Sequence, residues 1–253
     1  MGLFDYGTIT EDWGTAANQE QASMAATRYQ WLAEVAEGQE LLDLSSGTGY
    51  GLATVTGCTR LIASDLMFDN VHRAREMGIQ AEFLQADASR IPLSSSSIDV
   101  VACLEALYYL PAQPDLFHEA ARVLRPGGTL LVSLPNHHRR DFEPGGGSTS
   151  YPDAIELRRL SIDANLIPMV SGAYLWADRN ESAPLRFARR TLVRTGLIPK
   201  SMRAKSILKR LAYRHMQPLS EAVLAAPAQQ RTEIRQGSDG SPYTMLYLEA
   251  CKP

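Results

Sequence analysis

Cysteine is scarce in this sequence, and its three thiols stand far apart. Cys58, Cys103 and Cys251 form no C-x-x-C pair, which argues against a disulfide framework and against structural zinc. Cys103 lies in an apolar run, so we expect it in the core. The composition excludes little else, because 45% of the 253 residues are hydrophobic and 21% are charged, as in ordinary globular domains.

Long apolar runs and a secretory signal are also missing. No apolar run approaches the ~20 residues that a membrane-spanning helix needs. Residues 1–13 contain acids and lack the charged-then-apolar order of a signal peptide. These features predict a cytoplasmic protein.

Acidic residues are absent from one long stretch, residues 182–220. The stretch carries ten basic residues between 186 and 214. The rest of the chain contains the other 15 basic residues and all 28 acidic ones. Three interpretations stay open: a solvated helical face, recognition of an anionic acceptor, or peripheral contact of 186–214 with an anionic membrane. Nucleic acid is not favoured, because the chain is acidic overall and the stretch lacks interleaved aromatics.

Strand-like and helix-like segments alternate along most of the chain. The predicted strands are 41–44, 61–65, 81–85, 98–104, 129–134, 167–174 and 243–251. The predicted helices are 21–37, a short one at 52–57, 70–77, 112–124 and 153–164, and Pro126-Gly127-Gly128 is expected to form a tight return into the fifth strand. Such alternation predicts a doubly wound, mostly parallel α/β sheet that is covered on both faces.

The turn that follows the first predicted strand indicates a ligand site. Asp43, Asp65 and Asp87 occur at or near the ends of successive strands, where open α/β sheets bind ligands. Asp65 lies twenty residues after Ser45, a spacing that suits hydrogen bonds to ribose hydroxyls. The glycines do not form the G-x-G-x-x-G of a pyrophosphate turn, and a carboxylate beside the turn would repel a pyrophosphate. A ligand with a ribose, an ammonium and a sulfonium, S-adenosylmethionine, fits these charges better.

Several motifs in order then resemble a family. Residues 41–51, 64–66, 85–93 and 120–128 resemble the successive motifs of class I S-adenosylmethionine-dependent methyltransferases. The group most similar is the ubiquinone-biosynthesis-like one, with its relatives that methylate small molecules and glycans. The resemblance covers about residues 25–175 and the last strand. It implies a Rossmann-like, seven-stranded sheet whose last strand is reversed.

The resemblance also implies contacts with each part of the cofactor. The methionine end would contact Asp43, Gly47, Thr48, Gly49, Leu104 and Glu105. The ribose would contact Asp65, and the adenine would contact Leu66, Asp87 and Ala88. One position departs from the family pattern, since Ser45 stands where the first turn glycine is expected. A Cβ there could crowd the cofactor. Ser45 is therefore counted among the expected cofactor-binding residues, as the one that departs from the family pattern.

The acceptor side is less well marked. An oxygen or nitrogen acceptor that carries a proton needs a general base, and Tyr109 stands where related enzymes often have a histidine. A tyrosine is a poor base near neutral pH, so Tyr109 is expected to shape the pocket. His137 and His138, just beyond the fifth strand, are the better base candidates, although a histidine pair in a loop is often incidental. No metal is expected, because the acids that bind magnesium in catechol-type enzymes are absent.

The sequence therefore predicts one methyltransferase domain over residues 1–253. Residues 1–24 would be a lid or lead-in, 25–175 the cofactor-binding core, and 182–226 a basic helical insertion before the last strand. The expected reaction is O- or N-methylation of a small molecule, with an anionic, sugar-linked or lipid-linked intermediate as one option, by a monomer or homodimer. The alternative is a non-catalytic cofactor-binding relative, and a nicotinamide-dependent oxidoreductase is disfavoured by the glycine spacing.

Overall fold

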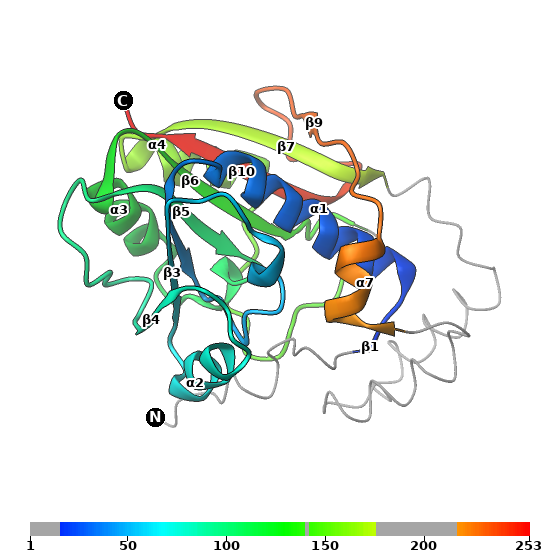
Figure 1. The fold of residues 1–253 in the computed structure, drawn as a ribbon. Coiled ribbons are helices and arrows are strands. Elements are labelled where there is room, and N and C mark those ends of the chain that lie inside the picture. Colours follow the sequence, from blue (N-terminus) through cyan, green and yellow to red (C-terminus); the bar gives the residue numbers. More distant parts are fainter. Residues whose placement is uncertain (1–15, 140–141, 176–216) are drawn as a thin grey trace.

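Eight strands form one mixed sheet in the computed structural model, which describes residues 16–139, 142–175 and 217–253. The strands run in the order β4 (Glu82–Gln85), β3 (Arg60–Asp65), β2 (Glu40–Leu44), β5 (Ile98–Leu104), β6 (Leu124–Pro135), β10 (Tyr243–Cys251), β7 (Ile167–Leu175) and β9 (Thr232–Glu233). Neighbours from β4 to β6 are parallel, whereas β10 is antiparallel to both β6 and β7. The predicted doubly wound α/β fold with a reversed last strand is therefore confirmed (Figure 1).

Helices connect and cover these strands. They are α1 (Gln19–Ala36), α2 (Phe68–Glu76), α3 (Gln113–Val123), α4 (Ala154–Asp163), α7 (Leu219–Ala225) and the 3-10 turns η2 (Leu52–Thr54) and η3 (Leu107–Tyr109). Capping boxes begin α1 at Asn18 and α4 at Asp153, where a side chain accepts hydrogen bonds from otherwise unpaired N–H groups. Helices α1 and α7 lie side by side (Figure 1), and the short pair β1 (Ala16–Ala17) and β8 (Gln217–Pro218) lies outside the main sheet.

Successive residues of each strand supply two separate cores, one on each face of the sheet. In β5, Val101 and Cys103 pack with the buried residues of α3 and α4. Val100 and Ala102 of the same strand pack with α1, whose Trp31 is 1% exposed. This alternation is the two-residue period of a strand that is buried on both faces, and it places Cys103 in the core as expected.

Two details differ from the sequence prediction near β6. The strand begins at Leu124 and runs through Pro126–Gly128, so these residues are not a separate return. A register shift opposite β5 absorbs them, and the Gly127 N–H and the Gly128 carbonyl hydrogen-bond to Lys252. Such a bulge, with Gly127 at φ +81°, is a conformation that glycine accommodates readily.

Two further details concern short elements. Residues 52–57 form only the single turn η2, because Val55 is already extended. The sheet has an eighth strand, β9, which pairs with Ser171 and Gly172 of β7. A strand of two residues has no periodic pattern, so it could not be predicted from the sequence.

Parts of two predicted segments lie outside the described residues. Within 1–24 the structure describes 16–24, which hold β1 and the start of α1, and within 182–226 it describes 217–226, which hold β8 and α7. The ten basic residues between 186 and 214 are not among them, so the roles predicted for that stretch stay predictions. Among the described residues, no helix has the length and apolar character to cross a membrane.

Candidate functional site

A cavity of about 550 Å³ opens where β2, β3, β4 and β5 end. The chain leaves β2 toward β3 on one side and later returns to β5 on the other, so the cavity lies at the topological switch point of the sheet. Its volume is that of a small-ligand site. Eight of the predicted cofactor residues line it: Ser45, Gly47, Asp65, Leu66, Asp87, Ala88, Leu104 and Glu105.

Asp65 ends β3, and three N–H groups hold its carboxylate. The backbone of Gly47 donates to Oδ2 at 2.9 Å, and the backbone of Met67 donates to Oδ1 at 2.8 Å. The Asn70 amide donates to Oδ1 at 3.1 Å. Burial raises the pKa of Asp65, and these hydrogen bonds partly oppose that rise. Two carboxylate oxygens offer about four acceptor positions, so capacity remains for a ligand hydroxyl.

Asp43 lies deeper, inside β2, between Ala63 of β3 and Ala102 of β5. Its side chain is 2% exposed and does not belong to the cavity wall, so its influence on the cavity is indirect. Burial raises the pKa of Asp43 well above its usual value, the charge of Asp65 raises it further, and Arg28 partly opposes both. The contact with the methionine end that the sequence predicts for Asp43 stays a prediction.

Two glycines of the turn are packed tightly against neighbouring side chains. A Cβ at Gly49 would lie 2.4 Å from Cδ1 of Ile79, and a Cβ at Gly51 would lie 1.9 Å from the ring of Tyr29. Gly49 and its buried neighbour Thr48 do not line the cavity, and the cofactor contacts predicted for them stay predictions. Gly47, at φ +57°, is the glycine of this turn that lines the cavity.

Ser45 adopts the backbone conformation of the glycine that it replaces. Its φ is +66°, a left-handed value that costs an L-residue roughly 1–2 kcal/mol. The residue still lines the cavity, and the next residue, Ser46, donates its N–H to the Ser64 carbonyl at 2.8 Å. The irregularity is therefore absorbed as backbone strain, with the turn kept in place.

Arg28 is a cavity residue that the sequence analysis missed. It lies in α1, is 7% exposed, and its guanidinium hydrogen-bonds to the Tyr50 hydroxyl. A buried guanidinium suits a carboxylate ligand, because it presents several donors in a planar fork. A signal was available, since Arg28 falls four residues from Met24 and from Leu32 on the apolar side of the predicted helix.

The end of β5 and the loop after it form the opposite wall. Glu105, at φ +57°, accepts hydrogen bonds from the Ser133 hydroxyl at 3.3 Å and from the Tyr108 hydroxyl at 3.4 Å. Tyr108 and Tyr109 line the cavity, and the Tyr108 ring stacks on Tyr151 at 4.5 Å. One cavity therefore joins an end rich in carboxylates to an aromatic end.

Residues 42–132 match the family described as a methyltransferase domain. A probable S-adenosylmethionine-dependent methyltransferase of Mycobacterium tuberculosis is 34% identical over 146 residues, which are 55% of this chain and 53% of that one. Residues 42–132 therefore lie in a methyltransferase domain. Both findings indicate S-adenosylmethionine as the cofactor of this domain.

Further comparisons agree on the domain and on the fold. The 27-O-demethylrifamycin SV methyltransferase of Amycolatopsis mediterranei is 29% identical over 47% of this chain and 46% of that one. The chain thus spans about half the length of the curated relatives it matches. A SAM-dependent methyltransferase structure from Thermotoga maritima has a TM-score of 0.57 at 12% identity, covering 92% of this chain and 94% of that one.

In this methyltransferase domain the two histidines lie away from the cavity wall. His137 and His138 follow β6, with ring centroids 4.1 Å apart, and neither lines the cavity. A row of aromatic rings separates them from it: His137 and Phe142 are 6.3 Å apart, and Phe142 and Tyr151 are 4.7 Å apart. Their role as a general base stays a prediction, while Tyr109 has the wall position expected of it.

Proposed function

We propose that the protein transfers the methyl group of S-adenosylmethionine to a small molecule bound in the cavity. The observation that carries the proposal is the continuity of the cavity from Asp65, at the end of β3, to Tyr109, beyond β5. A donor and an acceptor held in one enclosed space react as if at a high effective concentration. The 27-O-demethylrifamycin SV methyltransferase among the relatives supports a small-molecule acceptor.

The residues of the cavity fit the chemical groups of this cofactor. Asp65 has acceptor capacity for ribose hydroxyls, and Leu66 and Ala88 offer apolar contact for an adenine ring. Asp87 is exposed and holds the adjacent turn through the Ser89 N–H at 2.9 Å, with its second oxygen available to an amino group. Arg28 supplies a cation for the methionine carboxylate, and Glu105 supplies an anion for the ammonium.

Methyl transfer places modest chemical demands on this site. When bound, S-adenosylmethionine supplies an electrophilic methyl group on a sulfonium. The chain's own residues orient the acceptor and exclude water, and Tyr108 and Tyr109, with Tyr151 stacked behind Tyr108, give the acceptor end a rigid apolar wall. The proposal specifies the acceptor only as a small molecule that is methylated on an oxygen or a nitrogen atom. The acidic-acceptor and membrane roles of residues 186–214 stay predictions beside it.

Replacing Asp65 tests the proposal. Asp65→Ala should weaken binding of S-adenosylmethionine by about 1–3 kcal/mol, because a ligand hydroxyl loses a charged acceptor. Calorimetry on the folded variant measures this change. Asp69→Ala is the matched control, since Asp69 is exposed on α2 and does not line the cavity. Equal affinity of the Asp65 variant and the wild type would remove Asp65 from the site.

A non-catalytic, cofactor-binding relative is the second candidate function. The observation in its favour is that neither histidine lines the cavity. Under this alternative the chain would bind S-adenosylmethionine and its demethylated product with similar affinity. It would also release no demethylated product with any member of a panel of hydroxyl and amine acceptors. Turnover with a single acceptor eliminates this alternative.

A further inference from the structure

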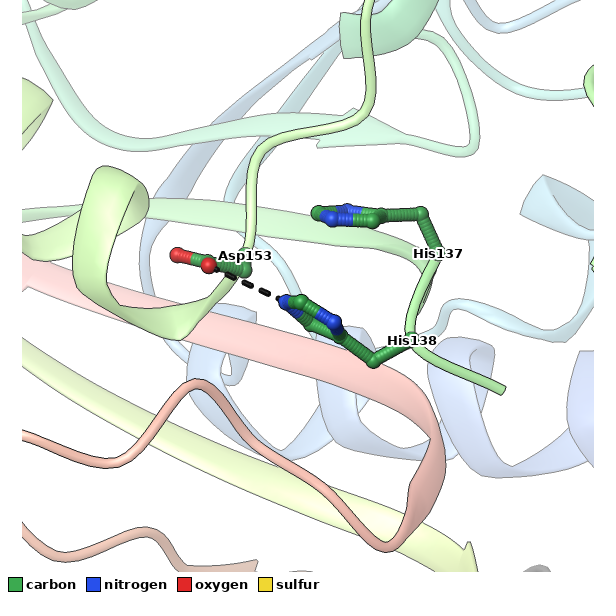
Figure 2. Close-up of side chains that lie close together, drawn as sticks. All are labelled: His137, His138 and Asp153. Atoms are coloured by element: carbon green, nitrogen blue, oxygen red, sulfur yellow. Dashed lines mark hydrogen bonds and ion pairs between the residues drawn. The ribbon is translucent and has the colours of Figure 1, made fainter. Parts of the chain in front are cut away.

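Two histidines and an aspartate gather beyond the end of β6, outside the cavity wall. One ring nitrogen of His137, one of His138 and a carboxylate oxygen of Asp153 lie within 4.8 Å of one another. Figure 2 shows both imidazole rings extending from the same side toward the Asp153 carboxylate. Imidazole nitrogens and carboxylate oxygens together are ligands that suit Zn²⁺ and related transition-metal ions.

The backbone fixes the direction in which Asp153 presents its second oxygen. Its Oδ1 accepts hydrogen bonds from the N–H groups of Ile155 and Glu156, both at 2.9 Å, at the start of α4. Its Oδ2 lies 3.2 Å from Nε2 of His138. Carboxylates that bind metals are themselves held by hydrogen bonds, as Asp153 is through Oδ1.

A second carboxylate has the same arrangement. Oδ1 of Asp239 accepts a hydrogen bond from the Ser241 N–H at 2.9 Å, and its Oδ2 lies 3.7 Å from Nε2 of His138. Two carboxylates therefore face one imidazole nitrogen, and their combined negative charge suits a divalent cation.

The two histidines are held differently. The backbone N–H of His138 donates to Oδ1 of Asn136 at 3.0 Å, and Asn136 is fully buried and bonded to the Tyr243 carbonyl. Nδ1 of His137 is buried and has no hydrogen-bond partner within the described part of the chain. A buried nitrogen without a partner is unfavourable, and the ring loses no hydrogen bond at Nδ1 if it binds a metal.

We propose that His137, His138 and Asp153 bind a divalent ion of the zinc class, with Asp239 as the fourth ligand. The ligand atoms draw together by side-chain rotation to the distances of about 2 Å that zinc requires. The ion joins the end of β6 to the start of α4 and to the loop before β10. The proposal departs from the expectation of no metal, which considered only acids of the catechol type, and it does not rest on methyl transfer.

Zinc titration of the full chain, first treated with a chelator, tests the proposal. Calorimetry should show one equivalent bound to the wild type, with affinity at least roughly tenfold lower in His138→Gln, Asp153→Asn and Asp239→Asn. Asp153→Asn is informative because asparagine still caps α4, and circular dichroism checks that each variant folds. His118→Gln is the matched control, since His118 is exposed on α3 and should leave zinc binding unchanged.

The possible results separate cleanly. A wild type that binds no zinc, or His138→Gln and Asp153→Asn variants that bind it as the wild type does, would overturn the site. Wild-type affinity in Asp239→Asn alone would overturn the assignment of the fourth ligand. Loss of binding in His118→Gln would overturn the placement of the site at β6.

Discussion

The turn after β2 and the connection after β6 lie at the same edge of the sheet but are built in different ways. The turn is short: Gly49 donates its N–H to Ser46, and Gly47 donates to Asp65 at the end of the neighbouring strand. The connection is long, and around His138 it brings together Asp153 from its own far end and Asp239 from the loop before β10. The first region could be interpreted from sequence motifs, whereas the second required the fold.

The largest expected effect comes from a substitution that disturbs the packing of the turn. Gly49→Ala should lower the free energy of unfolding by about 2–4 kcal/mol, because its Cβ meets Ile79 at 2.4 Å and its φ is +76°. Gly38→Ala is the matched control, with φ +71° and nothing within 4 Å of the added Cβ. It should lose only about 1–2 kcal/mol through backbone strain.

Urea denaturation measures both glycine variants. The difference between their losses of unfolding free energy measures the cost of packing, because both variants carry the same kind of backbone strain. Equal losses in the two variants would contradict the conclusion that Gly49 is packed tightly against its neighbours.

The second prediction concerns the buried acid beneath the turn. The folded-state pKa of Asp43 is raised by burial and by Asp65, so between its unfolded and folded pKa values the folded state binds more protons. The contribution of Asp43 to the free energy of unfolding is therefore fully present at low pH and is lost as the pH rises through that window. Asp43→Asn should therefore stabilise the ligand-free protein near neutral pH and flatten its pH dependence.

Denaturant unfolding of Asp43→Asn and the wild type across mildly acidic to neutral pH checks this sign. Parallel curves for the two proteins would show that Asp43 titrates as it does in the unfolded chain. Greater stability of the wild type at neutral pH would contradict the account of a buried, destabilised acid.

The smallest expected effect is at Ser45. Ser45→Gly should raise the free energy of unfolding by roughly 0.5–1 kcal/mol, because relief of the strain at φ +66° exceeds the added freedom of the unfolded glycine. Ser46→Gly, at a neighbour without positive φ, should lower it by about 0.5–1 kcal/mol. If both substitutions destabilise equally, the left-handed strain at Ser45 is not relieved by glycine.

The sheet could be predicted from the sequence to a large extent, because its strands have strong patterns. Residues 98–104 and 243–251 form β5 and β10 with the predicted bounds. The short β9 and the bulge at Pro126–Gly128 were not predicted. A two-residue strand has no periodic pattern, and a Pro-Gly-Gly run usually ends a strand rather than lying within one.

The cavity could be predicted in part. Asp65 ends β3, Leu66 follows it, and Asp87 lies two residues after β4, so topology alone brings them to one edge. Burial was harder to foresee: Asp43 and Thr48 lie behind the wall, whereas Arg28 reaches it from a helix. The grouping of His138 with Asp239 was out of reach, because about a hundred residues separate them in the sequence.

The central claim is that the cavity binds S-adenosylmethionine through the edge formed by β2, β3 and β4. Calorimetric titration of the folded wild type with S-adenosylmethionine, its demethylated product and a nicotinamide dinucleotide tests it most directly. We expect dissociation constants on the order of micromolar for the first two and no binding of the third. Binding of the dinucleotide alone, or no heat with any of them, would contradict the account.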